Sequence, residues 1–171
     1  SNSDNLGATL DPRILGHVIS QGLPFLMEVA DRTEADAKGG HLAMQDGQLI
    51  LREKAQCAPE DRATFQDHRR HRYFNTNNLW LDLDALQARL DAGGMHLPLI
   101  RNAKTVDPRD GASAPVYQLE SAMGAAIAVF AGSAALRVPR TRFSPVKTCA
   151  DLLRVRSDAT VLTADHRVVP A

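Results

Sequence analysis

The chain has 171 residues, which is enough for one domain of ordinary size with a hydrophobic core. Hydrophobic residues make up 44% of it and charged residues 23%, a composition that excludes intrinsic disorder and fibrous repeats. Twenty basic and twenty acidic side chains cancel, so the chain lacks the broad positive field of general nucleic-acid and membrane-surface binders.

The first third of the chain reads as a helix, a strand and a hairpin. Apolar side chains at helical spacing predict an amphipathic helix over residues 12–20. The apolar run within residues 23–33 predicts a buried strand. Two alternating segments within residues 39–56 are joined by Asp46 and Gly47, which tolerate the positive φ angles of a tight turn, so they predict a β-hairpin.

The middle of the chain continues this alternation. The polar residues 58–72 predict an exposed connection, and residues 73–82 predict a strand. Asp82 can cap a helix that ends at the glycine pair beginning with Gly93. Composition and spacing predict a strand, a loop and a second strand over residues 96–102, 107–115 and 135–139.

Two helices are predicted in the last third. Apolar residues keep a helical period from 116 to 130, which predicts a core helix carrying Val116, Leu119, Met123, Ile127 and Phe130. A final helix is expected within residues 147–158, because Thr148 and Asp151 have the spacing of a capping box. Strands and helices therefore alternate along one domain, and we expect the α/β class with a mixed sheet whose antiparallel part is the hairpin.

The sequence shows no membrane or disulfide signature. No apolar run approaches the roughly 20 residues of a membrane span, and no secretory signal is visible, so we expect a cytoplasmic protein. Cys57 and Cys149 lie far apart without metal-ligand spacing, and both are expected to be free thiols. The first and last residues suggest a piece of a longer protein.

Three asparagines crowd the stretch "FNTNNLW" at 74–80. An uncharged amide offers both donors and acceptors, so clustered asparagines suit a ligand rich in hydroxyls, such as a sugar. On strand alternation, Asn75 and Asn77 point to one face, and Phe74, Thr76 and Asn78 point to the other. The alternative is a strand end whose asparagines satisfy local backbone groups.

Two other stretches could meet a phosphate. Near the start, Asn2 and Asp4 would lie at the carboxyl edge of a sheet, where a single carboxylate beside phosphates could hold Mg²⁺. The alternative is a cap for the following helix. Lys147 directly precedes the expected N-cap Thr148, and a cation there is unfavourable unless an anion shares the site. The alternative for Lys147 is a solvated loop.

Several further features carry weaker signals. Gly39 could let backbone approach a ligand, and Glu53 could accept from sugar hydroxyls, although a hairpin start and a solvated strand end explain both residues as well. The basic run "HRRHR" at 68–72 is expected to be an exposed loop and not a nucleic-acid site, because the chain is neutral and the run has no interleaved aromatic residues.

The chain resembles the UTP:glucose-1-phosphate uridylyltransferase (UDP-glucose pyrophosphorylase) family. Six stretches carry the resemblance, occur in the family's order and span nearly the whole chain. They are "NSDNLGA" at 2–8, "EVADRTEADAKGG" at 28–40, "FNTNNLW" at 74–80, "NAKTVD" at 102–107, "QLESAMGAAI" at 118–127 and "VPRTRFSPVKT" at 138–148.

The resemblance implies a Rossmann-like nucleotidyltransferase domain, of which this chain would be the C-terminal half. The implied reaction takes UTP and glucose 1-phosphate to UDP-glucose and pyrophosphate with Mg²⁺. Residue by residue, it implies a catalytic lysine at Lys147, a metal ligand at Asp4, which also belongs to the substrate site, and substrate contacts at Asn2, Gly39, Glu53, Asn75, Asn77 and Phe143.

Two family features have no counterpart in the sequence. These are the Gly-rich loop that binds UTP, expected upstream of Ser1, and the C-terminal β-helix domain of eukaryotic members. We therefore expect the chain alone to bind its substrates poorly and to be inactive. Two alternatives stay open: a pyrophosphorylase that accepts several UDP-sugars, and a non-catalytic remnant that binds a sugar nucleotide.

Overall fold

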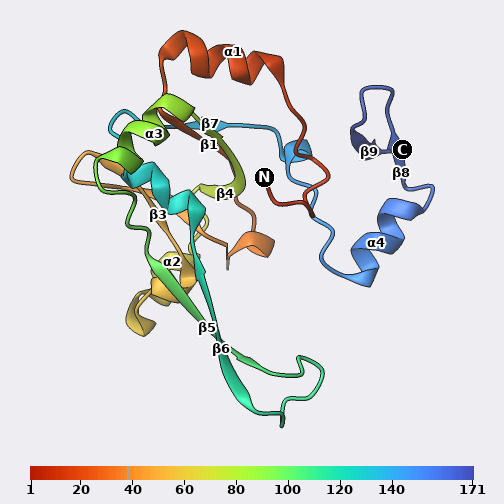
Figure 1. Ribbon diagram of the computed structural model, residues 1–171. Coiled ribbons are helices and arrows are strands. Elements are labelled where there is room, and N and C mark those ends of the chain that lie inside the picture. Colours follow the sequence, from red (N-terminus) through yellow and green to blue (C-terminus); the bar gives the residue numbers. More distant parts are fainter. Residues whose placement is uncertain (38) are drawn as a thin grey trace.

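The protein is described by a computed structural model covering residues 1–37 and 39–171, with a five-stranded mixed sheet at its centre (Figure 1). The α-helices are α1 (Pro12–Gln21), α2 (Arg62–Gln66), α3 (Leu83–Asp91) and α4 (Cys149–Arg156). The strands are β1 (Phe25–Asp31), β2 (His41–Gln45), β3 (Gln48–Arg52), β4 (Tyr73–Leu81), β5 (Leu99–Thr105), β6 (Pro115–Ser121), β7 (Ala134–Arg137), β8 (Thr160–Leu162) and β9 (Val168–Pro170). The predicted α/β class with a mixed sheet is confirmed.

Strand β1 organises the central sheet, whose order is β3-β2-β4-β1-β7. It pairs antiparallel with β4 and parallel with β7. Six of its seven residues are buried, as expected for a strand covered on both faces. The β2–β3 hairpin turns through Asp46 and Gly47 at φ 51° and 79°, which confirms the turn predicted from these two residues.

Helical segments cover both faces of the sheet. On one side, Ile14 and Val18 of α1 pack against Leu26 of β1. On the other, Ile127 and Phe130 join the core cluster of β1 and β3. Two predicted caps are confirmed, since Asp82 accepts from the backbone N–H of Ala85 at 2.8 Å and the Thr148–Asp151 capping box is formed.

The predicted core helix over residues 116–130 is wrong. Residues Pro115–Ser121 form strand β6, which pairs antiparallel with β5 along its whole length, and Met123–Ala128 form a 3₁₀ helix, η4. Gly124 passes so close to β3 that a Cβ there would lie 2.6 Å from Leu51 Cδ2. The helical spacing misled because Ile127 is indeed buried, whereas Leu119 and its neighbours lie exposed on the hairpin.

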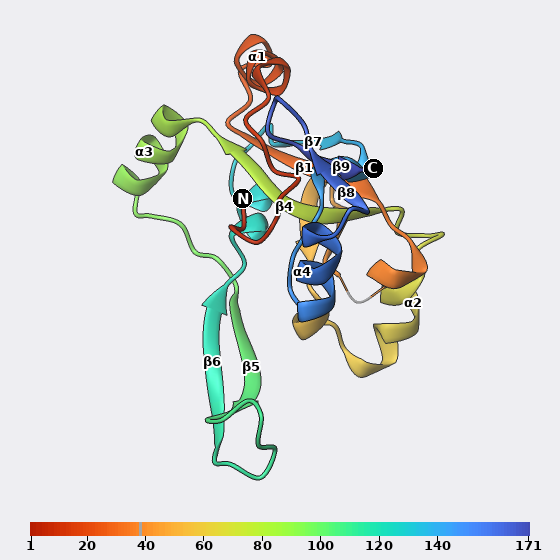
Figure 2. The same cartoon turned by 90° about the vertical axis from the view of Figure 1, so that its right-hand side faces the viewer.

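The β5–β6 hairpin extends away from the central sheet as a long arm (Figure 2). Its strands are exposed over most of their length, and Ile100 near its base is buried. At the carboxyl end, α4 is followed by a small β8–β9 hairpin, an element that the sequence did not indicate.

The predicted exposed connection over residues 58–72 is partly wrong. It contains α2, whose Phe65 is 1% exposed. The Phe65 ring lies 4.5 Å from that of the buried His41, centroid to centroid. Phe65 is a single aromatic residue in a polar segment, so no hydrophobic periodicity indicated its burial.

Two predictions from composition can be compared with the structure. Cys57 and Cys149 are free thiols, as expected. Within residues 1–37 and 39–171, no helix combines the length and apolar character needed to cross a bilayer.

Candidate functional site

The asparagine-rich stretch forms an irregular part of β4. Met27 pairs with Leu79 and Val29 pairs with Asn75, so the single residue Glu28 faces three residues of β4. Asn77, in the middle of the three, has φ 60°, a left-handed conformation that asparagine tolerates better than most residues. This backbone requirement is one reason for an asparagine at position 77.

Burial along β4 follows the two faces predicted from alternation. Phe74, Thr76 and Asn78 are buried, whereas Asn75 and Asn77 are half-buried. The Asn75 side-chain oxygen accepts from the backbone N–H of Asn77 at 2.8 Å, so part of the local backbone role considered for these asparagines is also present. The Asn77 amide nitrogen reaches Asn2, whereas the Asn75 amide nitrogen lies near Gly124 of η4.

The N-terminal segment lies along residues 143–147. Leu6 donates its backbone N–H to the carbonyl of Ser144 at 3.1 Å, and Val146 donates to the carbonyl of Asp4 at 2.9 Å. These bonds bring Asp4 next to the residue that precedes Lys147. Segments separated by about 140 positions in the sequence therefore meet at two of the predicted site residues.

Asn2 joins this segment to β4. Its side-chain oxygen accepts from Asn77 Nδ2 at 2.6 Å. Asn2 is exposed and Asp4 is half-buried, so both side chains can be reached from solvent. The Asp4 carboxylate enters none of the ion pairs among the described residues. The structure thus brings Asn2 into contact with Asn77, and Asp4 lies two residues farther along the same segment.

Lys147 is exposed directly before the N-cap of α4. The Asp151 carboxylate accepts from the backbone N–H groups of Lys147 and Thr148, at 3.0 and 2.8 Å. The helix start therefore already holds its own anion. The Thr148 hydroxyl, followed by these two backbone N–H groups, donates hydrogen bonds that lower the pKa of Asp151. The Lys147 ammonium, rather than these two amides, is left to meet a phosphate.

Glu53 and the glycines before β2 lie on the other side of Asn75. The backbone N–H of Asn75 donates to the Gly40 carbonyl at 3.0 Å. A Cβ on Gly40 would lie 2.5 Å from Glu53 Oε1, so a side chain there would displace this carboxylate. Burial, followed by the charge of Glu120, raises the pKa of Glu53. Gly39 lies one residue earlier and donates its N–H to Asp36; Lys38 of the same motif lies outside the described residues.

Phe143 is half-buried and packs edge-on against Phe74, with ring centroids 4.9 Å apart. This contact connects residues 143–147 to β4 directly. It places Phe143 beside the cluster, although its ring is engaged mainly in packing. Glu53 also lines a cavity of about 480 Å³ with Glu120 and Asn102 of the β5–β6 base.

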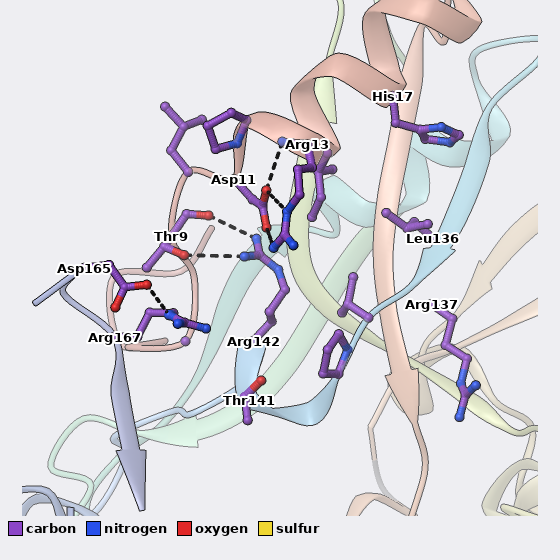
Figure 3. Close-up of a pocket in the computed structure, with 16 residues that line it drawn as sticks. Thr9, Asp11, Arg13, His17, Leu136, Arg137, Thr141, Arg142, Asp165 and Arg167 are labelled. Carbon is purple, nitrogen blue, oxygen red and sulfur yellow. Dashed lines mark hydrogen bonds and ion pairs between the residues drawn. The ribbon is translucent and has the colours of Figure 1, made fainter. Parts of the chain in front are cut away.

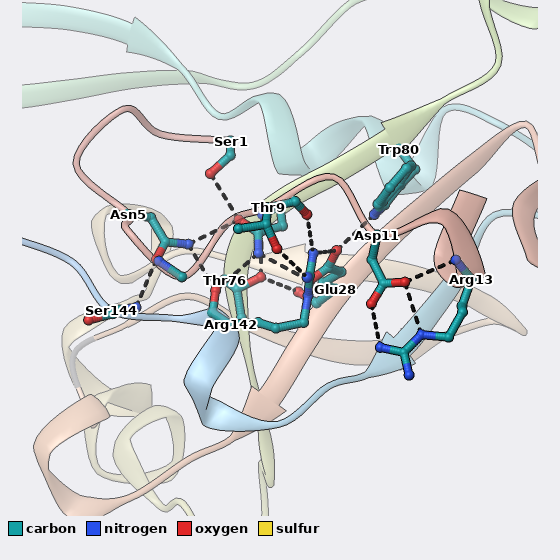
Figure 4. A network of polar contacts seen from close by, with 12 residues as sticks. Ser1, Asn5, Thr9, Asp11, Arg13, Glu28, Thr76, Trp80, Arg142 and Ser144 are labelled. Carbon is teal, nitrogen blue, oxygen red and sulfur yellow. Dashed lines mark hydrogen bonds and ion pairs between the residues drawn. The ribbon is translucent and has the colours of Figure 1, made fainter. Parts of the chain in front are cut away.

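A buried polar network under the site was missed by the sequence reasoning. Glu28 on β1 is fully buried and forms an ion pair with Arg142 at 2.6 Å (Figure 4). Asn5 and Asn78 join the same network and are almost fully buried. One signal was available, because a glutamate inside an apolar strand requires a charged or hydrogen-bonding partner.

A larger cavity of about 880 Å³ lies elsewhere, between α1, β7 and the C-terminal hairpin (Figure 3). It contains none of the predicted site residues. Its arginines are neutralised by acidic partners, in the pairs Arg13–Asp11, Arg137–Asp31, Arg142–Glu28 and Arg167–Asp165. We therefore assign no substrate to it.

Comparison with known proteins gives relatives that share one name. The family model for UTP--glucose-1-phosphate uridylyltransferase matches residues 1–170. The enzyme of that name from Saccharomyces cerevisiae is 49% identical over 158 residues, which is 92% of this chain and 32% of the relative. The one from Solanum tuberosum is 42% identical over 169 residues, which is 99% of this chain and 34% of the relative.

Solved structures share the fold over the whole chain. A UDP-glucose phosphorylase from Trypanosoma brucei superposes with a TM-score of 0.88 and 54% identity, covering 100% of this chain and 37% of that protein. A Leishmania major UDP-glucose pyrophosphorylase mutant in complex with UDP-glucose gives a TM-score of 0.85 and 53% identity, covering 100% and 39%. The chain spans about a third of the length of its curated relatives. With a family model matched over residues 1–170, this chain belongs to the UTP--glucose-1-phosphate uridylyltransferase family.

Proposed function

We propose that this chain serves in uridylyl transfer from UTP to glucose 1-phosphate, which gives UDP-glucose and pyrophosphate. One observation carries the proposal: the amides of Asn2 and Asn77 are in contact, and the same N-terminal segment pairs with the residues that lead into Lys147. Family membership supports it. A neutral, hydroxyl-binding cluster beside a cation is what a sugar phosphate requires.

Uridylyl transfer requires little covalent catalysis by the protein. A phosphate oxygen of glucose 1-phosphate attacks the α-phosphorus of UTP, a new P–O bond forms, and the bond to the departing pyrophosphate breaks. Positioning and charge neutralisation carry such transfers. Asn2, Asn75 and Asn77 would position the sugar nucleotide, and the Lys147 ammonium would stabilise the charge on the phosphates.

Asp4 fits a magnesium site that the substrate completes. Mg²⁺ is commonly bound by one or two carboxylates together with water and phosphate oxygens. The half-buried Asp4 carboxylate can supply the protein's share, and no group of three potential metal ligands occurs in the described parts of the chain. When bound there, Mg²⁺ would neutralise phosphate charge. Asp4 would hold it on the N-terminal segment, where the Asp4 carbonyl accepts from Val146, the residue before Lys147.

The hexose would lie along Asn75 and the glycines before β2. The Asn75 backbone N–H donates to Gly40, and the Glu53 carboxylate lies against the same glycine, so both residues adjoin one stretch of backbone. A site built to pair particular hydroxyls can discriminate a sugar epimer by as much as about 10⁴ in kcat/KM. We expect glucose 1-phosphate to be preferred over galactose 1-phosphate, and comparable kcat/KM values would favour a broad-specificity pyrophosphorylase instead.

The decisive test is Lys147→Ala, made in the full-length protein, with UDP-glucose formation from UTP and glucose 1-phosphate as the readout. Removing an electrostatic group of this kind is expected to lower turnover at least about a hundredfold without unfolding the protein. Arg156→Ala is the matched control, because it removes one exposed positive charge from the far end of α4. Near-normal turnover of Lys147→Ala would refute the assigned role.

Calorimetric titration with UDP-glucose tests binding separately from catalysis. Binding without turnover by the unsubstituted full-length protein would favour the non-catalytic alternative. Absence of both would overturn the proposed function. A cytoplasmic location stays a prediction, to be checked by cell fractionation.

A further inference from the structure

The carboxylate of Glu28 is fully buried and fully hydrogen-bonded (Figure 4). Oε1 accepts from Trp80 Nε1 at 2.8 Å and from Arg142 Nη2 at 2.7 Å. Oε2 accepts from Arg142 Nε at 2.6 Å and from Asn78 Nδ2 at 3.1 Å. Two donors on each oxygen leave no free position for a substrate.

The two buried amides are also saturated. Asn78 donates to Glu28 and to the Arg142 carbonyl, and its oxygen accepts from Ser1 Oγ and Asn5 Nδ2. Asn5 donates to Asn78 and to the same Arg142 carbonyl. Its oxygen accepts from two backbone N–H groups, those of Gly7 and Ser144. These asparagines therefore cannot bind substrate, unlike Asn75 and Asn77.

The network connects the two segments that carry the phosphate-binding candidates. Arg142 reaches the N-terminal segment through the Thr9 carbonyl at 3.0 Å, and Asn5 reaches the backbone of Ser144 at 2.8 Å. The adjoining backbone bonds, Leu6 to Ser144 and Val146 to Asp4, join the same two segments, and we call this line of contacts the seam. The seam ends at Asp4 on one side and next to Lys147 on the other.

We propose that Glu28, Asn5 and Asn78 are positioning residues that hold residues 1–9 against residues 140–147 and so set Asp4 relative to Lys147. The effect of this positioning on catalysis rests on the proposed function. The structural claim does not, because it concerns hydrogen bonds within the chain.

Two isosteric variants test the network, Asn78→Asp and Asn5→Asp. Each replaces an NH₂ donor by an oxygen, which repels the Arg142 carbonyl. In Asn78→Asp the new oxygen also faces the Glu28 carboxylate. The matched control is Trp80→Phe, which also removes a donor from Glu28, but one that links only β1 and β4. Asn5→Ala removes the same donor without added charge, should the isosteric variants fail to fold.

The first readout is hydrogen exchange of the Leu6 and Val146 amides, which form the seam. We expect both to exchange at least about tenfold faster in the network variants than in the unsubstituted chain, the effect of losing one buried hydrogen bond. The β2–β3 amides should keep their protection, and the control should leave Leu6 and Val146 unchanged. Unchanged exchange in the network variants, or equal acceleration in Trp80→Phe, would overturn the proposal.

The second readout separates positioning from loss of folded protein. A smaller folded fraction lowers the apparent turnover number but leaves half-saturating concentrations unchanged. A displaced Asp4 should instead raise the Mg²⁺ concentration that gives half-maximal rate, by about tenfold for each buried hydrogen bond lost. Faster exchange with an unchanged Mg²⁺ requirement would overturn the catalytic consequence. An unsubstituted protein with no activity would instead sink the proposed function and leave the exchange result valid.

Discussion

Asparagines occupy two regions of this molecule, which meet on β4. In the closed region the amides are buried and fully hydrogen-bonded, and in the open region they are accessible to solvent. In the closed region, Asn5 and Asn78 are 5% and 4% exposed, and each side chain makes four hydrogen bonds. In the open region, Asn75 and Asn77 are half-buried and, among the described residues, each retains amide groups free for a ligand. Satisfied amides hold segments together, whereas unsatisfied accessible amides are available to bind.

The largest effect should come from the centre of the closed region. Glu28→Ala removes the partner of Arg142, whose side chain is only 12% exposed, and breaking a buried pair typically costs about 3–5 kcal/mol. Urea unfolding should show a loss of this size. The exposed Asp31–Arg137 pair is the control, since solvent screens this pair and Asp31→Ala should leave the urea midpoint nearly unchanged. Equal losses of stability in the two variants would contradict the claim that the buried Glu28–Arg142 pair matters more than an exposed one.

The next prediction compares one asparagine from each region. Asn78→Ala leaves buried groups of Glu28 and Asn5 short of a partner, so the free energy of unfolding should fall by about 2–3 kcal/mol. Asn75→Ala removes an accessible amide, so it should cost less than about 1 kcal/mol. Its main effect should be a raised KM for glucose 1-phosphate. Chemical denaturation and steady-state kinetics on both variants check this. A large stability loss in Asn75→Ala with a raised KM only in Asn78→Ala would reverse the two roles.

A third region is buried but incompletely paired, and it sharpens the comparison through pH. Burial, followed by the charges of His71 and Arg32, lowers the pKa of His41 from 6.5 to about 3. His41 Nδ1 accepts from Arg32 Nη1 at 3.3 Å, and His41 Nε2 has no partner among the described residues. His41 therefore stays neutral in the folded state while it gains a proton in the unfolded chain.

Stability should consequently fall as pH drops below 6.5, because the unfolded state binds more protons across the window from 6.5 to about 3. Between pH 7 and pH 5 the His41 contribution is about 2 kcal/mol. Urea unfolding across this range should show a steeper decline for the unsubstituted chain than for His41→Leu. Parallel pH profiles would contradict the assignment.

The smallest stability effect is expected at Asn77. Glycine adopts φ 60° without strain, so Asn77→Gly should change the free energy of unfolding by less than about 1 kcal/mol. It also removes the hydrogen bond to Asn2, so weaker UDP-glucose binding is expected in calorimetry. Unchanged binding would show that position 77 serves only the backbone.

Local patterns predicted the elements whose signals are local. The Asp46-Gly47 turn, the Asp82 cap and the Thr148–Asp151 capping box are all present, because each depends on residues within four positions of one another. The helix expected over residues 116–130 is absent. Val116 and Leu119 have the spacing of a helix, but pairing with β5 satisfies the backbone as a strand.

The candidate site divides in the same way. Asn75, Asn77, Asp4 and Lys147 were predicted from the sequence, because their chemistry and the family motifs are visible there. Strand alternation separated Asn78 from Asn75 and Asn77, but the network that closes around Asn78 was not visible, because Asn5, Glu28, Asn78 and Arg142 are separated by up to 137 positions. Only the tertiary structure brings them together, since burial and hydrogen-bond saturation are properties of the packed chain and not of any single segment.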